Sequence, residues 1–240
     1  MIRTRNLPLQ LLALALLLLA VGGNASAQRR GPEQWRAEIT NLVADDVAHP
    51  PPPHAVLFVG SSSIRLWTTL AGDFPGIQTI NRGFGGSRIA DSTYYVDRIV
   101  VPYRPRLIVM YAGDNDVDEG RTGRQVTDDF KAFVARVRHD LPHAAIAYVS
   151  IKPSVARAAK WPRMRAANAS IARWARTKRD VMFIDVASKM LDADGKPRPD
   201  LFLEDGLHMR PAGYAIWIDA LKPVLARYGF VVTSSSPRAH

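Results

Sequence analysis

The sequence contains no cysteine among its 240 residues. This absence excludes disulfide bonds, thiol nucleophiles and thiolate metal sites, so the stability of the fold has to come from packing. Long apolar runs are also scarce. The longest covers residues 11–21, and its eleven residues fall short of the roughly 20 that a membrane-spanning helix needs.

That apolar run lies within an N-terminal segment that has the features of a secretory signal. Arg3 and Arg5 provide a basic start, and the small residues 25–27 resemble a cleavage site. We therefore expect residues 1–27 to be a signal peptide and the protein to be exported, either periplasmic or secreted. An uncleaved membrane anchor is the alternative. After cleavage we expect no stable membrane span.

Positive charge exceeds negative charge, with 32 Lys and Arg residues against 22 Asp and Glu residues and a formal net charge of +10. Such an excess can attract nucleic acid or anionic surfaces. The basic residues are scattered, however, and no aromatic-rich nucleic-acid-binding motif accompanies them. We predict no nucleic-acid partner and interpret the basic residues between 163 and 179 as the solvated face of a helix.

Short apolar runs rich in branched residues predict buried strands. They cover residues 55–59, 77–80, 107–111, 144–151 and 181–186. Helical patterns of apolar residues follow the third and fourth runs, around 130–137 and 164–175. Alternating strands and helices imply parallel pairing with right-handed crossovers. The predicted fold class is therefore α/β, a three-layer α/β/α arrangement with about five parallel strands.

The rest of the chain fits around one main domain. Apolar spacing predicts a leading helix over 32–47, and a proline run then forms an extended connector. A last helix should begin near Pro211, and Pro223 should kink or split it. The predicted parts are a signal peptide, a leading helix with its connector, the main domain and a flexible tail, at residues 1–27, 28–54, 55–232 and 233–240.

Polar and glycine-rich segments follow the predicted strands. Residues 60–63 follow the first strand, 81–87 the second and 113–116 the third, while Asp205 and His208 precede the last helix. Functional groups in an open parallel sheet gather at the carboxyl ends of the strands. We expect these distant segments to converge at one edge of the sheet.

The residue types in these segments indicate nucleophilic catalysis. A serine hydroxyl needs a base, and the spacing of Asp205 and His208 lets the carboxylate hold one imidazole nitrogen while the other accepts a proton. We predict Ser62 as the nucleophile, His208 as the general base and then acid, and Asp205 as the group that orients His208. The backbone amides of Ser62 and Gly86 and the side-chain amide of Asn115 are the predicted oxyanion hole.

Taken together, the blocks resemble the SGNH hydrolase superfamily of GDSL-type esterases. They read FVGSSS from Phe58, NRGFGG from Asn81, GDND from Gly113 and DGLH from Asp205. The chain is most similar to the branch that includes platelet-activating-factor acetylhydrolase-like esterases. The resemblance implies a flavodoxin-like fold and a cofactor-independent carboxylic ester hydrolase without a metal. It assigns the namesake positions and the third triad member to Ser62, Gly86, Asn115, His208 and Asp205.

One position departs from the superfamily pattern. Ser61 stands where an Asp usually precedes the nucleophile, which puts the hydrogen bonds of that Asp in question. Ser61 and Ser63 are alternative nucleophiles, and the three serines could instead cap the following helix. Gly85 is the alternative to Gly86 in the oxyanion hole.

A second pattern allows another interpretation. Asp114, Asp116 and Asp118 alternate as in a calcium-binding loop, but Glu119 and Gln125 occupy the places of the required Gly and Glu. We therefore favour a loop without calcium.

The predicted function is that of an exported serine esterase acting on small-molecule or glycan-linked esters. A short acyl group follows from the resemblance and from the lack of a long apolar insertion that could act as a lipid lid. Arg65 and Arg88 favour either an anionic substrate or surface ion pairs. The alternatives are a carbohydrate O-acetyltransferase with the same site and a non-catalytic binder of envelope glycans or lipids. No oligomeric state is predicted.

Overall fold

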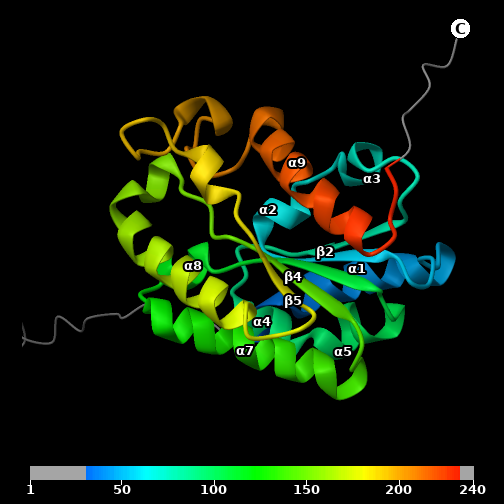
Figure 1. Ribbon diagram of the computed structural model, residues 1–240. Coiled ribbons are helices and arrows are strands. Elements are labelled where there is room, and N and C mark those ends of the chain that lie inside the picture. The colour runs from blue at the N-terminus through cyan, green and yellow to red at the C-terminus, as the bar shows by residue number, and fades with distance from the viewer. Residues whose placement is uncertain (1–30, 233–240) are drawn as a thin grey trace, which may run out of the picture. The chain divides into compact units, whose positions relative to one another are not determined.

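The computed structural model describes residues 31–232, so the predicted signal peptide and the predicted tail lie outside the described residues. A five-stranded sheet forms the centre of this part of the chain (Figure 1). All strand pairs are parallel, in the order β2-β1-β3-β4-β5. The strands are β1 (Val56–Gly60), β2 (Thr79–Gly83), β3 (Leu107–Tyr111), β4 (Ala145–Val149) and β5 (Val181–Ile184). The predicted α/β class and the strand number are confirmed, but Asn81, Arg82 and Gly83, predicted to follow the second strand, lie within β2.

Four of the strands, β1, β3, β4 and β5, are almost entirely apolar because helices cover both faces of the sheet, whereas the edge strand β2 contains Thr79, Asn81 and Arg82. In β1, Leu57 and Val59 pack into the core on one face, and Val56 and Phe58 pack into the core on the other. Two separate hydrophobic cores therefore hold the layers together, which is why β1, β3, β4 and β5 lack an alternation of apolar and polar residues.

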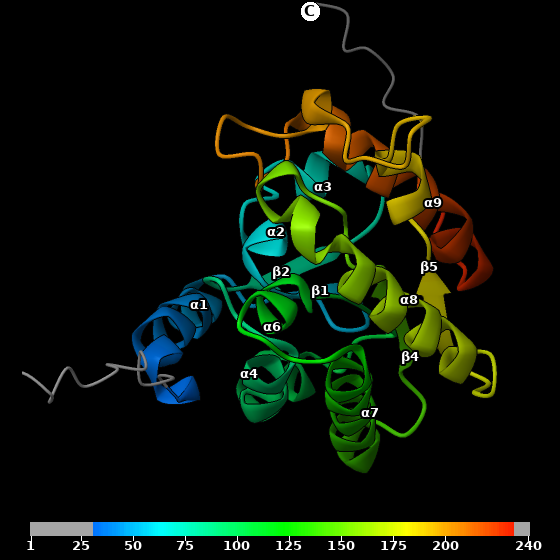
Figure 2. The ribbon, with the colours of Figure 1, turned by 90° about the vertical axis from the view of Figure 1, so that its left-hand side faces the viewer.

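Helices of both layers are arranged around the sheet (Figure 2). One core receives side chains from α1 (Arg36–Ala48), α4 (Ile89–Tyr94), α5 (Val96–Ile99), α6 (Asp114–Asp118), α7 (Gly123–Asp140) and α8 (Trp161–Ala175). The other core receives side chains from α2 (Ser62–Arg65), α3 (Leu70–Asp73) and α9 (Pro211–Arg227). Short 3₁₀ helices are η1 (Pro32–Trp35), η2 (Val101–Tyr103), η3 (Val155–Lys160), η4 (Ala187–Met190) and η5 (Pro199–Leu201). Within residues 31–232, no helix has the length and apolar character to cross a bilayer.

The last helix differs from its prediction. Pro223 lies within α9, yet α9 is one helix from Pro211 to Arg227, so the expectation of a split is wrong. Pro223 has no N–H to donate to the carbonyl oxygen of Asp219, one turn earlier in the helix. Both residues are exposed, so water can donate to that oxygen instead. Buried Trp217 and Leu221 anchor the opposite side of the helix in the core.

The strand order reverses direction at one point of the sheet. The chain runs from β1 outward to β2 and then returns to form β3 on the other side of β1. As a result, α2 leaves β1 toward one face, whereas α6 leaves β3 toward the other. Crevices at such switch points, outside the carboxyl ends of the strands, are the usual ligand sites of open α/β sheets.

Candidate active site

The turn after β1 brings Ser62 to this switch point. Gly60, the last residue of β1, has a φ of 136°, and a Cβ there would lie 1.8 Å from the carbonyl oxygen of Tyr111 in β3. Only glycine permits the two strand ends to approach this closely. The Ser61 backbone N–H then donates to that same Tyr111 oxygen at 2.9 Å, and Ser62 begins α2.

Asp205 and His208 lie on a tight turn between η5 and α9. The backbone N–H of Leu203 donates to the His208 carbonyl oxygen at 2.7 Å, and Gly206 has a φ of 62°, a conformation that favours glycine. The backbone N–H groups of Leu207 and His208 both donate to Asp205 Oδ1 at 2.9 Å. The turn itself therefore fixes the carboxylate beside the imidazole.

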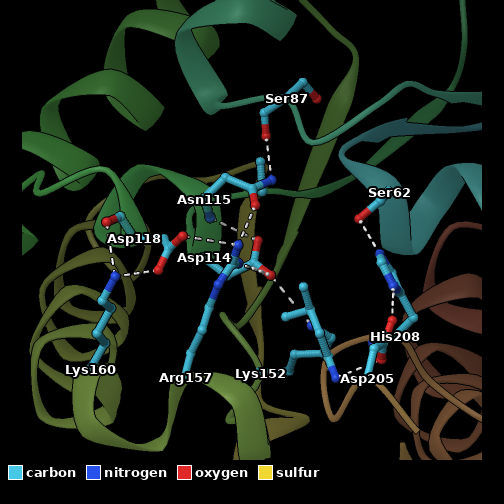
Figure 3. Close-up of polar contacts among 12 residues, drawn as sticks. Ser62, Ser87, Asp114, Asn115, Asp118, Lys152, Arg157, Lys160, Asp205 and His208 are labelled. Atoms are coloured by element: carbon cyan, nitrogen blue, oxygen red, sulfur yellow. Dashed lines mark hydrogen bonds and ion pairs between the residues drawn. The ribbon is translucent and has the colours of Figure 1, made fainter. Parts of the chain in front are cut away.

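A chain of hydrogen bonds joins the three predicted triad residues (Figure 3). His208 Nδ1 lies 2.5 Å from Asp205 Oδ2, and His208 Nε2 lies 3.1 Å from Ser62 Oγ. A carboxylate can only accept, so Nδ1 carries the hydrogen and Nε2 is left to accept from the Ser62 hydroxyl. The arrangement can remove a proton from Ser62.

The charge of Asp205 is secured by its surroundings. Burial raises its pKa, but hydrogen bonds from the Leu207 and His208 amides and the contact with the imidazole outweigh this, and the pKa of Asp205 is about 2. The carboxylate is therefore ionised at neutral pH and can stabilise an imidazolium. The side chains of Asp205 and His208 are 46% and 26% exposed, so the site is open to solvent.

The neighbouring serines have different environments. Ser61 is fully buried, does not cap α2 with its side chain, and its hydroxyl oxygen has no hydrogen-bond partner within the described part of the chain. Ser63 is also buried, and its carbonyl oxygen accepts a hydrogen bond from the Tyr214 hydroxyl at 3.0 Å. Of the three serines, Ser62 is the one that contacts His208.

Gly86 and Asn115 are neighbours, since a Cβ on Gly86 would lie 3.8 Å from Asn115 Nδ2. Asn115 Nδ2 donates one hydrogen to the Ser87 carbonyl oxygen at 3.0 Å, and its second N–H can serve an oxyanion. The Gly85 backbone N–H donates to Glu38 Oε1 at 3.0 Å. That contact occupies the Gly85 amide and favours Gly86 as the oxyanion donor.

Three charged residues that we did not predict as part of the site lie next to Asn115. Asp114 Oδ2 is 3.3 Å from Lys152 Nζ and 3.2 Å from Arg157 Nη1, and Asp114 Oδ1 accepts the Asn115 backbone N–H at 3.1 Å (Figure 3). Burial raises the pKa of Asp114, but the two cations outweigh burial and lower it, while burial lowers the pKa of Lys152. Lys152 directly follows the apolar run 144–151 that predicted β4. Because strand ends meet at the sheet edge, this position could have indicated that Lys152 lies near the site.

The aspartates of the possible calcium loop point to different partners. Asp116 Oδ1 accepts the backbone N–H of Ile89 at 3.3 Å, and Asp118 pairs with Arg157 and Lys160. Burial raises the pKa of Asp116 to about 7. A calcium loop instead turns its carboxylates toward one ion. Among residues 31–232, no group of acidic and histidine side chains is placed to hold a metal ion.

The two arginines considered for substrate binding form ion pairs. Arg65 Nη1 lies 3.6 Å from Glu38 Oε1, and Arg88 Nη2 lies 3.1 Å from Asp91 Oδ1. Both arginines therefore form ion pairs within the protein, the alternative to binding an anionic substrate, and neither guanidinium is a free anion-binding group.

Comparison with known proteins adds a family match. Residues 59–216 match the model of the GDSL-like lipase/acylhydrolase family. The matched range contains Ser62, Gly86, Asn115, Asp205 and His208. No curated protein matches the chain at a significant level.

Solved structures share the fold at low sequence identity. A Streptococcus pneumonia protein, provisionally described as a platelet activating factor, is 21% identical with a TM-score of 0.71, over 89% of this chain and 99% of that chain. A GDSL-like lipase from Bacteroides thetaiotaomicron is 20% identical with a TM-score of 0.68, over 80% and 98%. A carbohydrate esterase of family 3 from Talaromyces cellulolyticus is 18% identical with a TM-score of 0.57, over 73% and 98%.

Proposed function

Because the chain belongs to the GDSL-like lipase/acylhydrolase family, we propose that it hydrolyses carboxylic esters through Ser62, His208 and Asp205. The observation that carries the proposal is the hydrogen-bonded series from Ser62 Oγ through both imidazole nitrogens to Asp205. Nucleophile, base and orienting carboxylate in this series are the arrangement that acyl transfer by serine requires.

The reaction follows from the direction of these hydrogen bonds. Ser62 Oγ attacks the ester carbonyl while His208 Nε2 takes the hydroxyl proton, and the same nitrogen gives that proton to the leaving alcohol. Water then attacks the acyl-enzyme with His208 again as the base, releasing the acid and restoring Ser62. Asp205 keeps the imidazole in the required tautomer and stabilises its positive charge in both steps.

The negative charge that develops on the carbonyl oxygen needs donors already in place. We assign the backbone amides of Ser62 and Gly86 and the side-chain amide of Asn115 to this role. The pairing of Gly60 with Tyr111 across β1 and β3 supports the assignment, since Ser62 and Asn115 follow these two adjacent strand ends. The closeness of Gly86 to the Asn115 side chain supports it as well.

The proposed substrates are esters with short acyl groups. The openness of the site at Asp205 and His208 supports this choice, because an exposed site offers little apolar surface for a long chain. Similarity of fold to a carbohydrate esterase makes sugar-linked esters a reasonable class to test. An acetate ester and an octanoate ester of p-nitrophenol would measure the chain-length preference, and equal kcat/KM values for the two would contradict it.

The proposal is tested by kinetics on purified variants. Ser62→Ala and His208→Ala should each lower kcat for p-nitrophenyl acetate by at least about 10³-fold, because nucleophile and base act as a unit. Ser63→Ala is the matched control and should retain turnover if it folds. Near wild-type turnover in folded Ser62→Ala would refute the mechanism.

A further inference from the structure

The side chain of Asn115 is held at both ends of its amide. At one end, Nδ2 donates to the carbonyl oxygen of Ser87 at 3.0 Å. At the other end, Oδ1 accepts a hydrogen bond from Arg157 Nη2 at 3.0 Å (Figure 3). Asn115 itself is buried. The amide plane is therefore fixed by two partners that lie far from it in sequence.

The guanidinium and the Ser87 carbonyl oxygen favour the same orientation of the amide. The two ends of an asparagine amide have nearly the same shape, but guanidinium groups only donate hydrogen bonds. Rotating the amide by half a turn would place its N–H donors against the donors and positive charge of Arg157. Arg157 therefore keeps Asn115 Oδ1 on its own side and Nδ2 on the side of Ser87, which leaves the second N–H of Nδ2 for the proposed oxyanion.

Arg157 is itself fixed by acidic side chains. Its Nη1 lies 3.2 Å from Asp114 Oδ2, and its Nη2 lies 3.3 Å from Asp118 Oδ2. The Arg157 side chain is 13% exposed, so most of the guanidinium is withdrawn from solvent, where such contacts are stronger than at the surface. The donor that faces Asn115 consequently has little freedom to move.

The segment that carries Arg157 also contacts the turn of Asp205 and His208. The backbone N–H of Ala156 donates to the Gly206 carbonyl oxygen at 3.0 Å. A Cβ on Gly206 would lie 3.1 Å from Val155 Cβ, so the two segments pack closely. Through η3, one short stretch of chain joins the oxyanion donor to the turn that carries the catalytic base.

We infer that Arg157 is a positioning residue for the oxyanion hole, acting through Asn115, and this inference rests on the proposed function. Arg157 does not touch the reacting atoms. It sets the orientation of the amide, and its positive charge beside Oδ1 polarises the amide and strengthens the N–H that faces the oxyanion. Because the oxyanion exists in the transition state and not in the ester, the effect belongs to kcat more than to KM.

A double-mutant cycle between Arg157 and Asn115 tests this inference. We would measure kcat and KM for p-nitrophenyl acetate with wild type, Arg157→Ala, Asn115→Ala and the double variant, and confirm folding by circular dichroism and thermal unfolding. Asn115→Ala should lower kcat roughly 10²–10³-fold. Arg157→Ala should lower kcat about 10–100-fold with KM within about threefold, because a small misplacement of a catalytic group has an effect of this size.

The signature of positioning is non-additivity. If Arg157 acts through Asn115, then Arg157→Ala should change kcat by no more than about twofold once Asn115 is already alanine. Lys160→Ala is the matched control, since Lys160 pairs with Asp118 from the same segment without touching Asn115, and it should stay within about twofold of wild type.

A more conservative variant keeps the test possible if Arg157→Ala does not fold. Should Arg157→Ala unfold, Arg157→Lys takes its place in the cycle, because lysine keeps a charge opposite Asp114 but lacks the planar fork that serves Asp114 and Asn115 together. Independent effects that multiply in the double variant, or a folded Arg157 variant with wild-type kcat, would overturn the inference. A folded wild-type protein without Ser62-dependent turnover would instead overturn the proposed function.

Discussion

The surroundings of Asp205 and Asp116 shift the pKa values of these two carboxyl groups in opposite directions. Asp205 accepts two backbone N–H groups and contacts His208, and its pKa is about 2. Asp116 is fully buried, accepts one backbone N–H at Oδ1 and has no hydrogen-bond partner at Oδ2 within residues 31–232; burial raises its pKa to about 7. Two carboxylates of one protein therefore titrate in different pH ranges because of hydrogen bonding and desolvation.

The state of Asp116 predicts a pH dependence of stability. The unfolded chain releases this proton near pH 3.8, whereas the folded protein retains it up to about pH 7. Between these values the folded state binds more protons, so the contribution of Asp116 to stability declines as the pH rises through this window. Replacing Asp116 by Asn removes the titration, and the Tm of Asp116→Asn relative to wild type should increase between pH 5 and pH 8.

Thermal unfolding at the two pH values checks this prediction. The exposed Asp194→Asn variant is the control, and its Tm difference from wild type should be the same at both values. An Asp116→Asn variant whose Tm difference does not change with pH would show that Asp116 is already ionised in the folded protein at pH 5.

Sequence patterns reached some of the site residues and missed others for a physical reason. Ser62, Asn115, Asp205 and His208 were identified because each lies in a short block whose residue types match a chemical role. Arg157 lies in no such block, and the segment around it shows neither strand nor helix periodicity. Its contact with Asn115 spans 42 positions and arises only when η3 packs at the sheet edge.

The length of a secondary-structure element decides whether the sequence predicts it. Apolar runs predicted the number of strands, although β4 (Ala145–Val149) is shorter than its run and β2 (Thr79–Gly83) shares only two residues with the run 77–80, because its last three residues are polar or glycine. The periodic helices α7 and α8 were also predicted. By contrast, α2 and α6 have only four and five residues, too few to show helical periodicity, although both begin at the predicted site.

Gly60 allows β1 to end where Ser62 is needed. Because a Cβ at this position would overlap the Tyr111 carbonyl and φ is in the left-handed range, Gly60→Ala should lower the free energy of unfolding by at least about 2 kcal/mol. Gly72→Ala is the matched control, since no atom lies within 4 Å of the added methyl. Urea denaturation measures both, and equal stability of the two variants would contradict the role given to Gly60.

At the scale of the whole molecule, the site depends on the complete sheet. The proposed nucleophile follows β1, the oxyanion donor follows the adjacent central strand β3, and the base lies on the turn before α9. These residues are far apart in the chain and meet because parallel strands end at the same edge. No single hairpin or helix pair of this fold contains the whole arrangement.

We propose that the protein is exported, on the basis of the basic, apolar and small-residue pattern of residues 1–27. Expression of the full chain in a bacterial host should yield protein outside the cytoplasm that begins at Gln28. Intact mass measurement of that protein checks the prediction, and a mass that includes the first 27 residues would contradict cleavage.

The central claim is that Ser62 is an activated nucleophile, and labelling with a fluorophosphonate tests it without a choice of substrate. The purified protein would be treated with the probe, digested, and the adduct located by peptide mass spectrometry, with His208→Ala as the control that lacks the base. We predict one adduct, on Ser62, that forms far more slowly in His208→Ala. An adduct on Ser61 or Ser63, or no adduct on the folded wild-type protein, would contradict the proposed site.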